Sequence, residues 1–241
     1  MSLSQSEQKN LVARTAVETL LKKGLLFSGM KIGLGTGSTA LPAVKRLSEF
    51  IAEGVLKNIK AVATSFQTEN ACIDWNIPVY SFKDRVIGGE LDLALDGADE
   101  IDEKNNCIKG GGAALLREKI VAYNSKKFVI VADSSKSVKT LGTKFALPVE
   151  IIPEAFVVVK KALEKLGANV VLREGVRKCG PVITDNGNQI VDCLWKEPVD
   201  PEKMEDIIND ITGVVEVGFF TKNKPIAFIS KEDGTVEVRG L

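Results

Sequence analysis

The sequence predicts an α/β protein in which crossover helices join parallel strands, together with a smaller ferredoxin-like α+β module. Three observations support this fold class. Short apolar runs alternate with segments of helical periodicity up to Pro148. Polar loops follow the carboxyl ends of several of these runs, which is where open α/β sheets bind their ligands. After Pro148 the order of expected elements changes to β-α-β-β-α-β.

Helices and strands alternate in the first part of the chain. The expected helices share apolar residues at i, i+3 and i+4 spacing and cover residues 6–26, 40–50 and 66–72. The expected strands are short, mostly apolar runs and cover residues 31–34, 59–63, 78–80, 91–95 and 128–131. The last two of these strands deliver Asp96 and Asp133 to polar loops. The loops that carry chemical groups are therefore expected at strand carboxyl ends.

The second part of the chain mixes strands with two helices. Strands are expected over residues 149–152, 169–172, 182–184, 189–194 and 214–217, and helices over residues 155–166 and 202–211. Asn186-Gly187 between two β-rich runs is a strong hairpin signal. A last hairpin, formed by residues 225–230 and 235–238, could rejoin the first sheet. These patterns predict a catalytic α/β domain of residues 1–148 and 218–241 and a second domain of residues 149–217.

Composition excludes several classes of function. The 241 residues include 32 basic and 32 acidic side chains, so no overall charge favours nucleic acid or an anionic membrane. The chain contains no histidine, which leaves acid–base chemistry to carboxylates and lysines. Its four cysteines form no CxxC pair. The polar start and the lack of any run near ~20 apolar residues predict a cytoplasmic protein.

The first candidate site is the glycine loop at residues 33–39, GLGTGST, between an expected strand and helix. Backbone N–H groups at a helix N-terminus bind anions. The dinucleotide fingerprint would require glycine at Ser38, and the nucleoside-triphosphate loop would require a lysine that is absent. The loop therefore predicts a small phosphate or carboxylate cradle, with a simple tight turn as the alternative. Lys136, in the loop after Asp133, could complete a phosphate site at the same sheet edge.

The second candidate site runs from Asp96 to Lys119. Asp96 and Asp99 could bind hydroxyl groups, and a magnesium site that adds Glu100 is an alternative. Residues 102–104 are expected to be a solvated turn.

Lys109 precedes three glycines, which must form a loop because glycine is costly inside a helix. A helix starting near Ala113 would place Glu118 in its second turn, on a partly apolar face. Burial there would raise the carboxyl pKa and suit a general base.

With these motifs in place, the chain resembles the ribose-5-phosphate isomerase family of the A type. The resemblance rests on GTGSTA (35–40), DGADEID (96–102), KGGGAALLREK (109–119), ADSSK (132–136) and GPVITDNGN (180–188). Five motifs in the family's order are far more specific than any one of them. The resemblance implies a doubly wound α/β domain with an inserted ferredoxin-like module, and a homodimer or homotetramer.

The resemblance also implies an aldose–ketose isomerase that interconverts ribose 5-phosphate and ribulose 5-phosphate without metal or organic cofactor. Glu118 would move a proton between C2 and C1 through an enediolate, Lys109 would offset the oxyanion charge, and Asp96 and Asp99 would assist ring opening. The implied substrate contacts are Thr36, Gly37, Ser38, Thr39, Asp96, Gly97, Ala98, Asp99, Lys109, Gly110, Gly111, Gly112 and Lys136.

Two other classes stay open at this stage. A sugar-phosphate-sensing domain would keep the phosphate cradle and lose catalysis, but Glu118, Lys109 and both aspartates are present. A different enzyme on a similar sheet is the other alternative, such as an amino-sugar phosphate isomerase or a coenzyme A transferase. The former typically recruits histidine, which this chain lacks.

Overall fold

The structure, a computed structural model, describes residues 2–241. The chain forms two compact units. The first unit contains the chain up to Ala98, then Arg117–Ser137 and Pro225–Leu241. The second unit contains Asp99–Leu116 and Val138–Lys224. The predicted boundary for the second domain, residues 149–217, lies inside the second unit, which is longer at both ends and includes a separate earlier segment.

The first unit is built on a six-stranded sheet with the order β13-β12-β6-β3-β1-β2. Its strands are β1 (Lys31–Leu34), β2 (Lys60–Ala63), β3 (Leu93–Gly97), β6 (Phe128–Asp133), β12 (Ile226–Ser230) and β13 (Val236–Arg239). Only β13 runs antiparallel to its neighbour. The mostly parallel α/β sheet is therefore confirmed, and the last hairpin does rejoin it.

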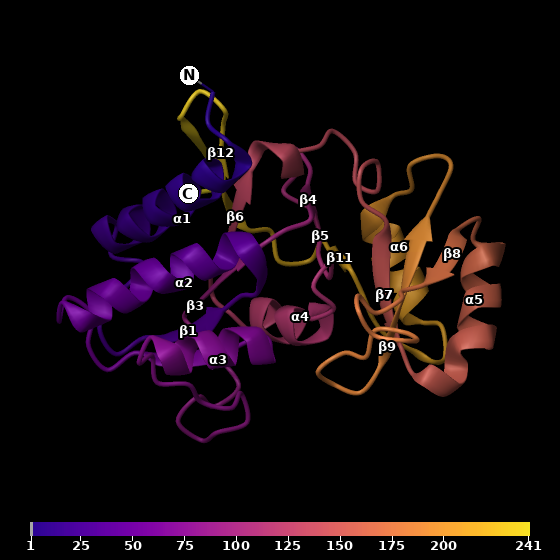
Figure 1. Ribbon diagram of the computed structural model, residues 1–241, viewed down its shortest axis with the longest axis horizontal. Helices are drawn as coiled ribbons and strands as arrows, with labels where there is room; N and C mark the ends of the chain where they lie inside the picture. The colour runs from indigo at the N-terminus through magenta and orange to yellow at the C-terminus, as the bar shows by residue number, and fades with distance from the viewer. Residues whose placement is uncertain (1) are drawn as a thin grey trace. The chain divides into compact units, whose positions relative to one another are not determined.

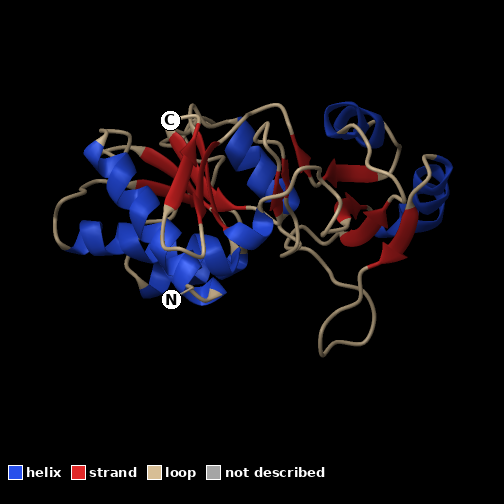
Figure 2. Ribbon diagram, turned by 90° about the horizontal axis from the view of Figure 1, so that it is seen from above, coloured by secondary structure: helices blue, strands red, loops and turns tan. Residues whose placement is uncertain are grey.

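Helices cover both faces of this sheet (Figures 1 and 2). They are α1 (Gln5–Lys22), α2 (Gly37–Ala52), α3 (Phe66–Asp74) and α4 (Leu115–Tyr123). Ile32 and Leu34 of β1 join the apolar core that α1 and α2 form. Gly33 between them faces the other way, since side chains alternate along a strand, and it lies against Val121 of α4. The core thus orients β1 so that its carboxyl end leads directly into α2.

The strand order reverses direction between β1 and β3. The chain passes from β1 through α2 to β2 on one side, and β3 then pairs with β1 on the other side. Ligands of open α/β sheets bind outside the carboxyl ends of the strands at such a switch point. Leu34 pairs with Leu95, so the turn after β1 and the carboxyl end of β3 meet there.

The second unit contains a four-stranded antiparallel sheet with the order β10-β7-β9-β8. Its elements are β7 (Leu147–Ile151), α5 (Phe156–Lys165), β8 (Asn169–Leu172), β9 (Gln189–Leu194), α6 (Pro201–Asn209) and β10 (Val214–Val217). Val149 on β7 shares one apolar core with Val159 of α5 and Ile208 of α6, so both helices pack on the same face. The β-α-β-β-α-β element order is present, but the short strand also expected at residues 182–184 is not among these elements.

A small three-stranded sheet in the second unit was not expected from the sequence. It consists of β4 (Glu100–Ile101), β5 (Cys107–Ile108) and β11 (Phe219–Phe220), in the order β11-β5-β4. Two short turns of 3₁₀ helix, η1 (Ser134–Lys136) and η2 (Pro153–Ala155), complete the secondary structure within residues 2–241.

Two expected strands are reduced to isolated bridges. Val79 forms a single bridge with Ala61, and Ile183 forms one with Gln189. In the first of these segments, Pro78 has no N–H group to donate, which limits the hydrogen bonds that residues 78–80 can form with a neighbouring strand. In the part of the chain that the structure describes, every helix is too short or too polar to cross a lipid bilayer.

Candidate active site

Asp96 lies at the carboxyl end of β3, beside the turn that follows β1. Its Oδ1 accepts hydrogen bonds from the N–H groups of Thr36, at 3.1 Å, and Gly97, at 2.7 Å. The sequence placed Asp96 in a loop, but the structure places it within the strand, because β3 continues to Gly97. Strand pairing and two backbone donors therefore fix a carboxyl group that is 3% exposed.

Thr36 is the N-cap residue of α2, but its hydroxyl does not cap the helix. It donates to Ser65 Oγ at 2.7 Å and lies 2.8 Å from Thr64 Oγ1. Thr68 adds a bond from its hydroxyl to the Gly35 carbonyl, at 2.7 Å. The turn after β2 and the first turn of α3 thus hold the glycine loop in place.

The expected loop at residues 37–39 is instead the first turn of α2, which begins at Gly37. Ser38 is exposed and Thr39 is 8% exposed, packed beside Gly97. The first N–H groups of a helix have no intrahelical partner and carry partial positive charge. Starting the helix earlier places the N–H groups of Ser38 and Thr39 at the helix N-terminus, while the Gly37 N–H donates to Gln67 Oε1 at 3.1 Å.

Lys9 also lies at the start of α2, although no motif in the sequence points to it. Its Nζ, on α1, donates to Ser38 Oγ at 3.0 Å, which adds a cation to the start of α2. Nothing in the local sequence distinguishes it from other polar residues of an amphipathic helix, because the contact depends on the packing of α1 beside α2.

Lys136 closes the 3₁₀ turn that follows β6. Asp133 is fully buried and organises this turn by accepting the Ser135 N–H at 3.1 Å. Because β6 pairs in parallel with β3, Gly97 opposite Val131, the β6 loop opens on the same sheet edge as Asp96. The loops after β1, β3 and β6 therefore all open at the edge of the sheet where these strands have their carboxyl ends, as predicted.

Glu118 lies in the first turn of α4, not in the second as expected. The helix begins at Leu115, because Ala113 adopts a left-handed conformation with φ of 57°. Glu118 is 6% exposed, so its face is inward as predicted. Val121, three residues further and on the same side of the helix, packs against Gly33 of β1. A buried carboxyl group is thus held on a helix that is fixed to the central strand.

Lys109 belongs to the second unit and follows β5. Its side chain is buried, 3% exposed, with Nζ 5.6 Å from the centroid of the Phe220 ring. Its N–H donates to the Gly218 carbonyl at 2.9 Å. Lysine is almost never fully buried in a protein unless its charge is paired. The strand pair β5–β11 determines where this ammonium lies.

Asp99 anchors the three glycines that follow Lys109. Its Oδ2 accepts the Gly111 N–H at 2.7 Å, and a Cβ added at Gly111 would lie 2.5 Å from Asp99 Oδ1. Gly110 has φ of 108°, which favours glycine. The predicted loop at residues 110–112 is present, and at least two of its glycines are structurally required.

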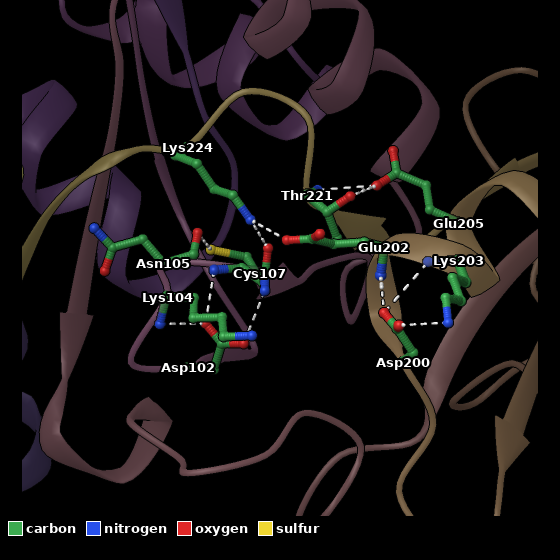
Figure 3. A network of polar contacts seen from close by, with 11 residues as sticks. Asp102, Lys104, Asn105, Cys107, Asp200, Glu202, Lys203, Glu205, Thr221 and Lys224 are labelled. Atoms are coloured by element: carbon green, nitrogen blue, oxygen red, sulfur yellow. Dashed lines mark hydrogen bonds and ion pairs between the residues drawn. The ribbon is translucent and has the colours of Figure 1, made fainter.

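A polar network supports the turn before Lys109 (Figure 3). Asp102 is 8% exposed and accepts the N–H groups of Lys104, at 2.9 Å, and Asn106, at 2.8 Å. Lys224 donates to both Asn106 and Glu202. The expectation of a solvated turn is therefore wrong for Asp102, whose carboxyl group closes the β4–β5 hairpin.

Glu100 does not suit the alternative magnesium site. It is 1% exposed, and its two oxygens accept the backbone N–H groups of Gly142, at 2.5 Å, Lys144, at 2.6 Å, and Phe145, at 2.8 Å. These bonds use the carboxylate to hold a loop. Among residues 2–241, no group of three or more Asp, Glu or Cys side chains has the arrangement of a metal site.

The predicted site residues divide between the two units. The first unit brings residues 36–39, Asp96 and Gly97 together at one sheet edge, with Ala98 next in sequence, and contains Glu118 and Lys136. The second unit joins Asp99 to the glycines after Lys109. In the first unit, an anion cradle and a carboxylate at the switch point of a parallel sheet define the class of protein: an α/β enzyme for a small phosphorylated substrate.

Comparisons with known proteins identify the family. A sequence model described as ribose 5-phosphate isomerase A (phosphoriboisomerase A) matches residues 60–234. The chain is 58% identical over 237 residues to ribose-5-phosphate isomerase A of Treponema denticola, covering 98% of this chain and 99% of that protein. Its identity to the Treponema pallidum protein of the same name is 52%, covering 98% and 94%. The chain belongs to the ribose 5-phosphate isomerase A family.

Solved structures agree with this assignment. The ribose 5-phosphate isomerase A of Methanocaldococcus jannaschii superimposes with a TM-score of 0.89 at 42% identity, covering 98% of this chain and 99% of that one. A D-ribose-5-phosphate isomerase in complex with phospho-erythronic acid gives a TM-score of 0.91 at 38% identity, with the same coverage.

Proposed function

We propose that this protein interconverts D-ribose 5-phosphate and D-ribulose 5-phosphate, a step of the non-oxidative branch of the pentose phosphate pathway. The observation that carries the proposal is the match over 98% of the chain to a ribose-5-phosphate isomerase A, with 99% of that relative covered. Full coverage means that both units have counterparts in the relative. The loops described above supply a chemical group for each role that the reaction needs.

The substrate phosphate binds at the start of α2. The N–H groups and hydroxyls of Ser38 and Thr39 supply donors, and Lys136 adds a positive charge from the neighbouring loop. The Gly37 N–H, which donates to Gln67 Oε1 without substrate, lies beside them. Lys9 already donates to Ser38 and joins this group. The helix N-terminus and two ammonium groups together favour a dianion over a neutral sugar.

Glu118 transfers the proton. In the open aldose its carboxylate removes the proton from C2, the C1–C2 double bond forms, and O1 takes up the negative charge. The proton on O2 then passes to O1, which becomes the hydroxyl oxygen of the ketose, and O2 becomes the ketone oxygen as the carboxylic acid returns its proton to C1. C2 is oxidised while C1 is reduced within the same molecule, so the reaction requires no external oxidant or reductant. The low exposure of Glu118 supports this role because water is largely excluded from the carboxyl group.

Lys109 offsets the charge that develops on the oxygen during this transfer. Asp96 and Asp99 bind sugar hydroxyls and assist ring opening, and the backbone of Gly97, Ala98 and residues 110–112 lines the sugar. The rigid hydrogen bonding of Asp96 and Asp99 supports these roles, because each carboxylate is preorganised before substrate binds.

We also propose the finer organisation of the chain. Residues 149–217 form a ferredoxin-like module inserted into a doubly wound catalytic domain of residues 1–148 and 218–241, which the antiparallel order β10-β7-β9-β8 supports. The protein forms a homodimer or homotetramer and acts in the cytoplasm. Light scattering of the purified chain tests the oligomeric state, since a monomer would contradict it.

Conversion of ribose 5-phosphate by the purified chain tests the proposed function. We expect ¹³C NMR of C1-labelled ribose 5-phosphate to show ribulose 5-phosphate forming until equilibrium. A chain that binds ribose 5-phosphate but leaves it unchanged is a sensor and contradicts the proposal. The same assay with an amino-sugar phosphate as substrate distinguishes the proposed reaction from that of an amino-sugar phosphate isomerase.

A further inference from the structure

Arg173, just after β8 in the second unit, contacts the loop that follows Lys109. Its Nη1 donates to the carbonyl of Gly110 at 2.8 Å and to that of Gly111 at 3.1 Å. The side chain is only 16% exposed. A residue more than sixty positions further along the chain thus holds the backbone of the proposed sugar-binding loop.

The guanidinium group is itself held in place by Asp192 on β9. Its Nε donates to Asp192 Oδ2 at 2.8 Å, and its Nη2 donates to Oδ1 at 2.5 Å. Two hydrogen bonds to the same carboxylate fix the plane of the guanidinium group, whereas a single hydrogen bond would let it rotate. The Arg173 backbone is also bound on both sides, to Ile190 and Val182. The sheet of the second unit therefore aims the remaining guanidinium nitrogen at the glycine carbonyls.

The loop is fixed from two directions. Arg173 binds the Gly110 and Gly111 carbonyls, while Asp99 accepts the Gly111 N–H. Ordering a flexible backbone costs conformational entropy, and glycine loses the most, so three consecutive glycines need such anchors. Without Arg173, the carbonyls of the loop would have to turn to water.

These contacts determine where the next amide points. The C=O and N–H of a trans peptide point in opposite directions. Fixing the Gly111 carbonyl on Arg173 therefore directs the Gly112 N–H to the opposite side of the loop. Within residues 2–241 this N–H has no hydrogen-bond partner. The Gly112 N–H is therefore a hydrogen-bond donor whose direction is fixed by the contact of Arg173 with the Gly111 carbonyl, and it lies in the loop that follows Lys109.

We propose that Arg173 is a positioning residue for isomerisation, with Asp192 as the group that orients it. Arg173 holds the glycine loop so that Lys109 and the Gly112 N–H face the oxygen that becomes charged in the enediolate. The role depends on the proposed function described above. It also assigns a task to the second unit's sheet, which holds part of the catalytic loop.

The role predicts a specific kinetic signature. Arg173→Lys keeps the charge, but a single ammonium cannot bind both Asp192 oxygens and two carbonyls at once. We expect kcat to fall about 10- to 100-fold, which is less than the roughly 10²–10³-fold cost of removing an oxyanion-stabilising donor outright. KM should change less than about threefold, because the phosphate contacts lie on other elements. Asp192→Asn should act in the same direction but less strongly.

Ligand binding separates positioning from general structural support. Phosphoerythronate carries a planar carboxylate in place of the reacting carbons, whereas inorganic phosphate has only the phosphate group. Arg173→Lys should weaken phosphoerythronate binding by a factor similar to the loss in kcat and leave inorganic phosphate binding unchanged. Equal weakening of both ligands would overturn the positioning role.

A matched control and a double variant complete the test. Arg46 is equally enclosed, 19% exposed, and binds Glu18 and Glu49, so Arg46→Lys should alter thermal stability but not kcat. Adding Asp192→Asn to Arg173→Lys should cause little further loss, because Asp192 acts through Arg173.

A folded Arg173→Lys variant with kcat within twofold of wild type overturns this inference. If that variant does not fold, Asp192→Asn with unchanged kcat does so instead. An inactive wild-type chain would refute the proposed function itself, so the two failures differ.

Discussion

The carboxylate of Asp96 lies directly against the backbone of Gly35. A Cβ added at Gly35 would lie 2.0 Å from Asp96 Oδ1 and 2.6 Å from the Asp96 Cα. Such contacts are too close for any side chain, so glycine at this position is what allows the carboxylate to reach the Thr36 N–H. Gly35 therefore shapes the site through its contact with Asp96.

Gly35→Ala should consequently damage both stability and activity. Overpacking of this kind typically costs about 1–3 kcal/mol, and part of the closest contact is backbone that cannot move away. We expect a lower melting temperature and a loss of roughly 100-fold in kcat/KM, since displaced catalytic groups have effects of that size.

Gly97→Ala provides the comparison for folding. A Cβ there would meet its nearest atoms at 3.8 Å, which is ordinary contact. Its melting temperature should stay close to that of wild type. Equal destabilisation by the two substitutions would show that the Gly35–Asp96 contact is not the cause.

The phosphate contacts predict an effect on affinity for two lysines. Lys9→Ala and Lys136→Ala each remove one ammonium from the proposed phosphate site. A hydrogen bond to a charged group is worth about 1.5–3 kcal/mol, so KM for ribose 5-phosphate should rise roughly tenfold or more. Inhibition by inorganic phosphate should weaken in parallel. Lys22→Ala, an exposed change in the last turn of α1, is the control and should leave both quantities unchanged.

If inorganic phosphate inhibits a lysine variant as strongly as it inhibits the wild-type protein, that lysine is not part of the phosphate site. The two residues can fail independently, because they lie on different elements, α1 and η1.

Cysteine reactivity should be confined to one position. Burial raises the pKa of the Cys72 thiol to about 11 and also raises the pKa of Cys193, so neither forms much thiolate near neutral pH. Cys107 is buried, whereas Cys179 is exposed. Iodoacetamide at pH 7.5 should label Cys179 alone in the native protein, as peptide mass spectrometry can measure, and all four cysteines in denaturant. Native labelling of Cys72 would contradict the buried environment of α3.

Much of the site could be predicted from the sequence because its signals are local. The strand, glycine turn and helix around residues 31–52 have the right periodicity and turn residues, and the structure has all three. The run from Leu91 predicted a strand before Asp96, although the strand extends two residues further than its apolar run, to Gly97. Backbone pairing with β6 favours the extension, and that pairing is not visible in a local pattern.

Other features depend on contacts between distant segments. Strands β4, β5 and β11 have two residues each, too few to show alternation, and they form because they pair with one another. Helix α4 starts later than expected because Ala113 adopts a left-handed backbone conformation, which an alanine in the sequence does not indicate. Lys9 and Arg173 look like ordinary surface residues until packing brings them to Ser38 and Gly110.

The central claim is that the Glu118 carboxylate transfers the proton. Glu118→Gln keeps the size of the side chain but removes the base, so turnover should fall by about 10²–10⁴-fold, the usual contribution of a general base. Glu150→Gln, at an equally buried carboxyl group that accepts from Thr184, is the matched control and should remain active.

The most direct test measures turnover and binding of ribose 5-phosphate with the same Glu118→Gln preparation. The proposed mechanism predicts that turnover is almost abolished while the dissociation constant stays within about threefold of the wild-type value, because the phosphate contacts are intact. Near-normal turnover by Glu118→Gln would contradict it.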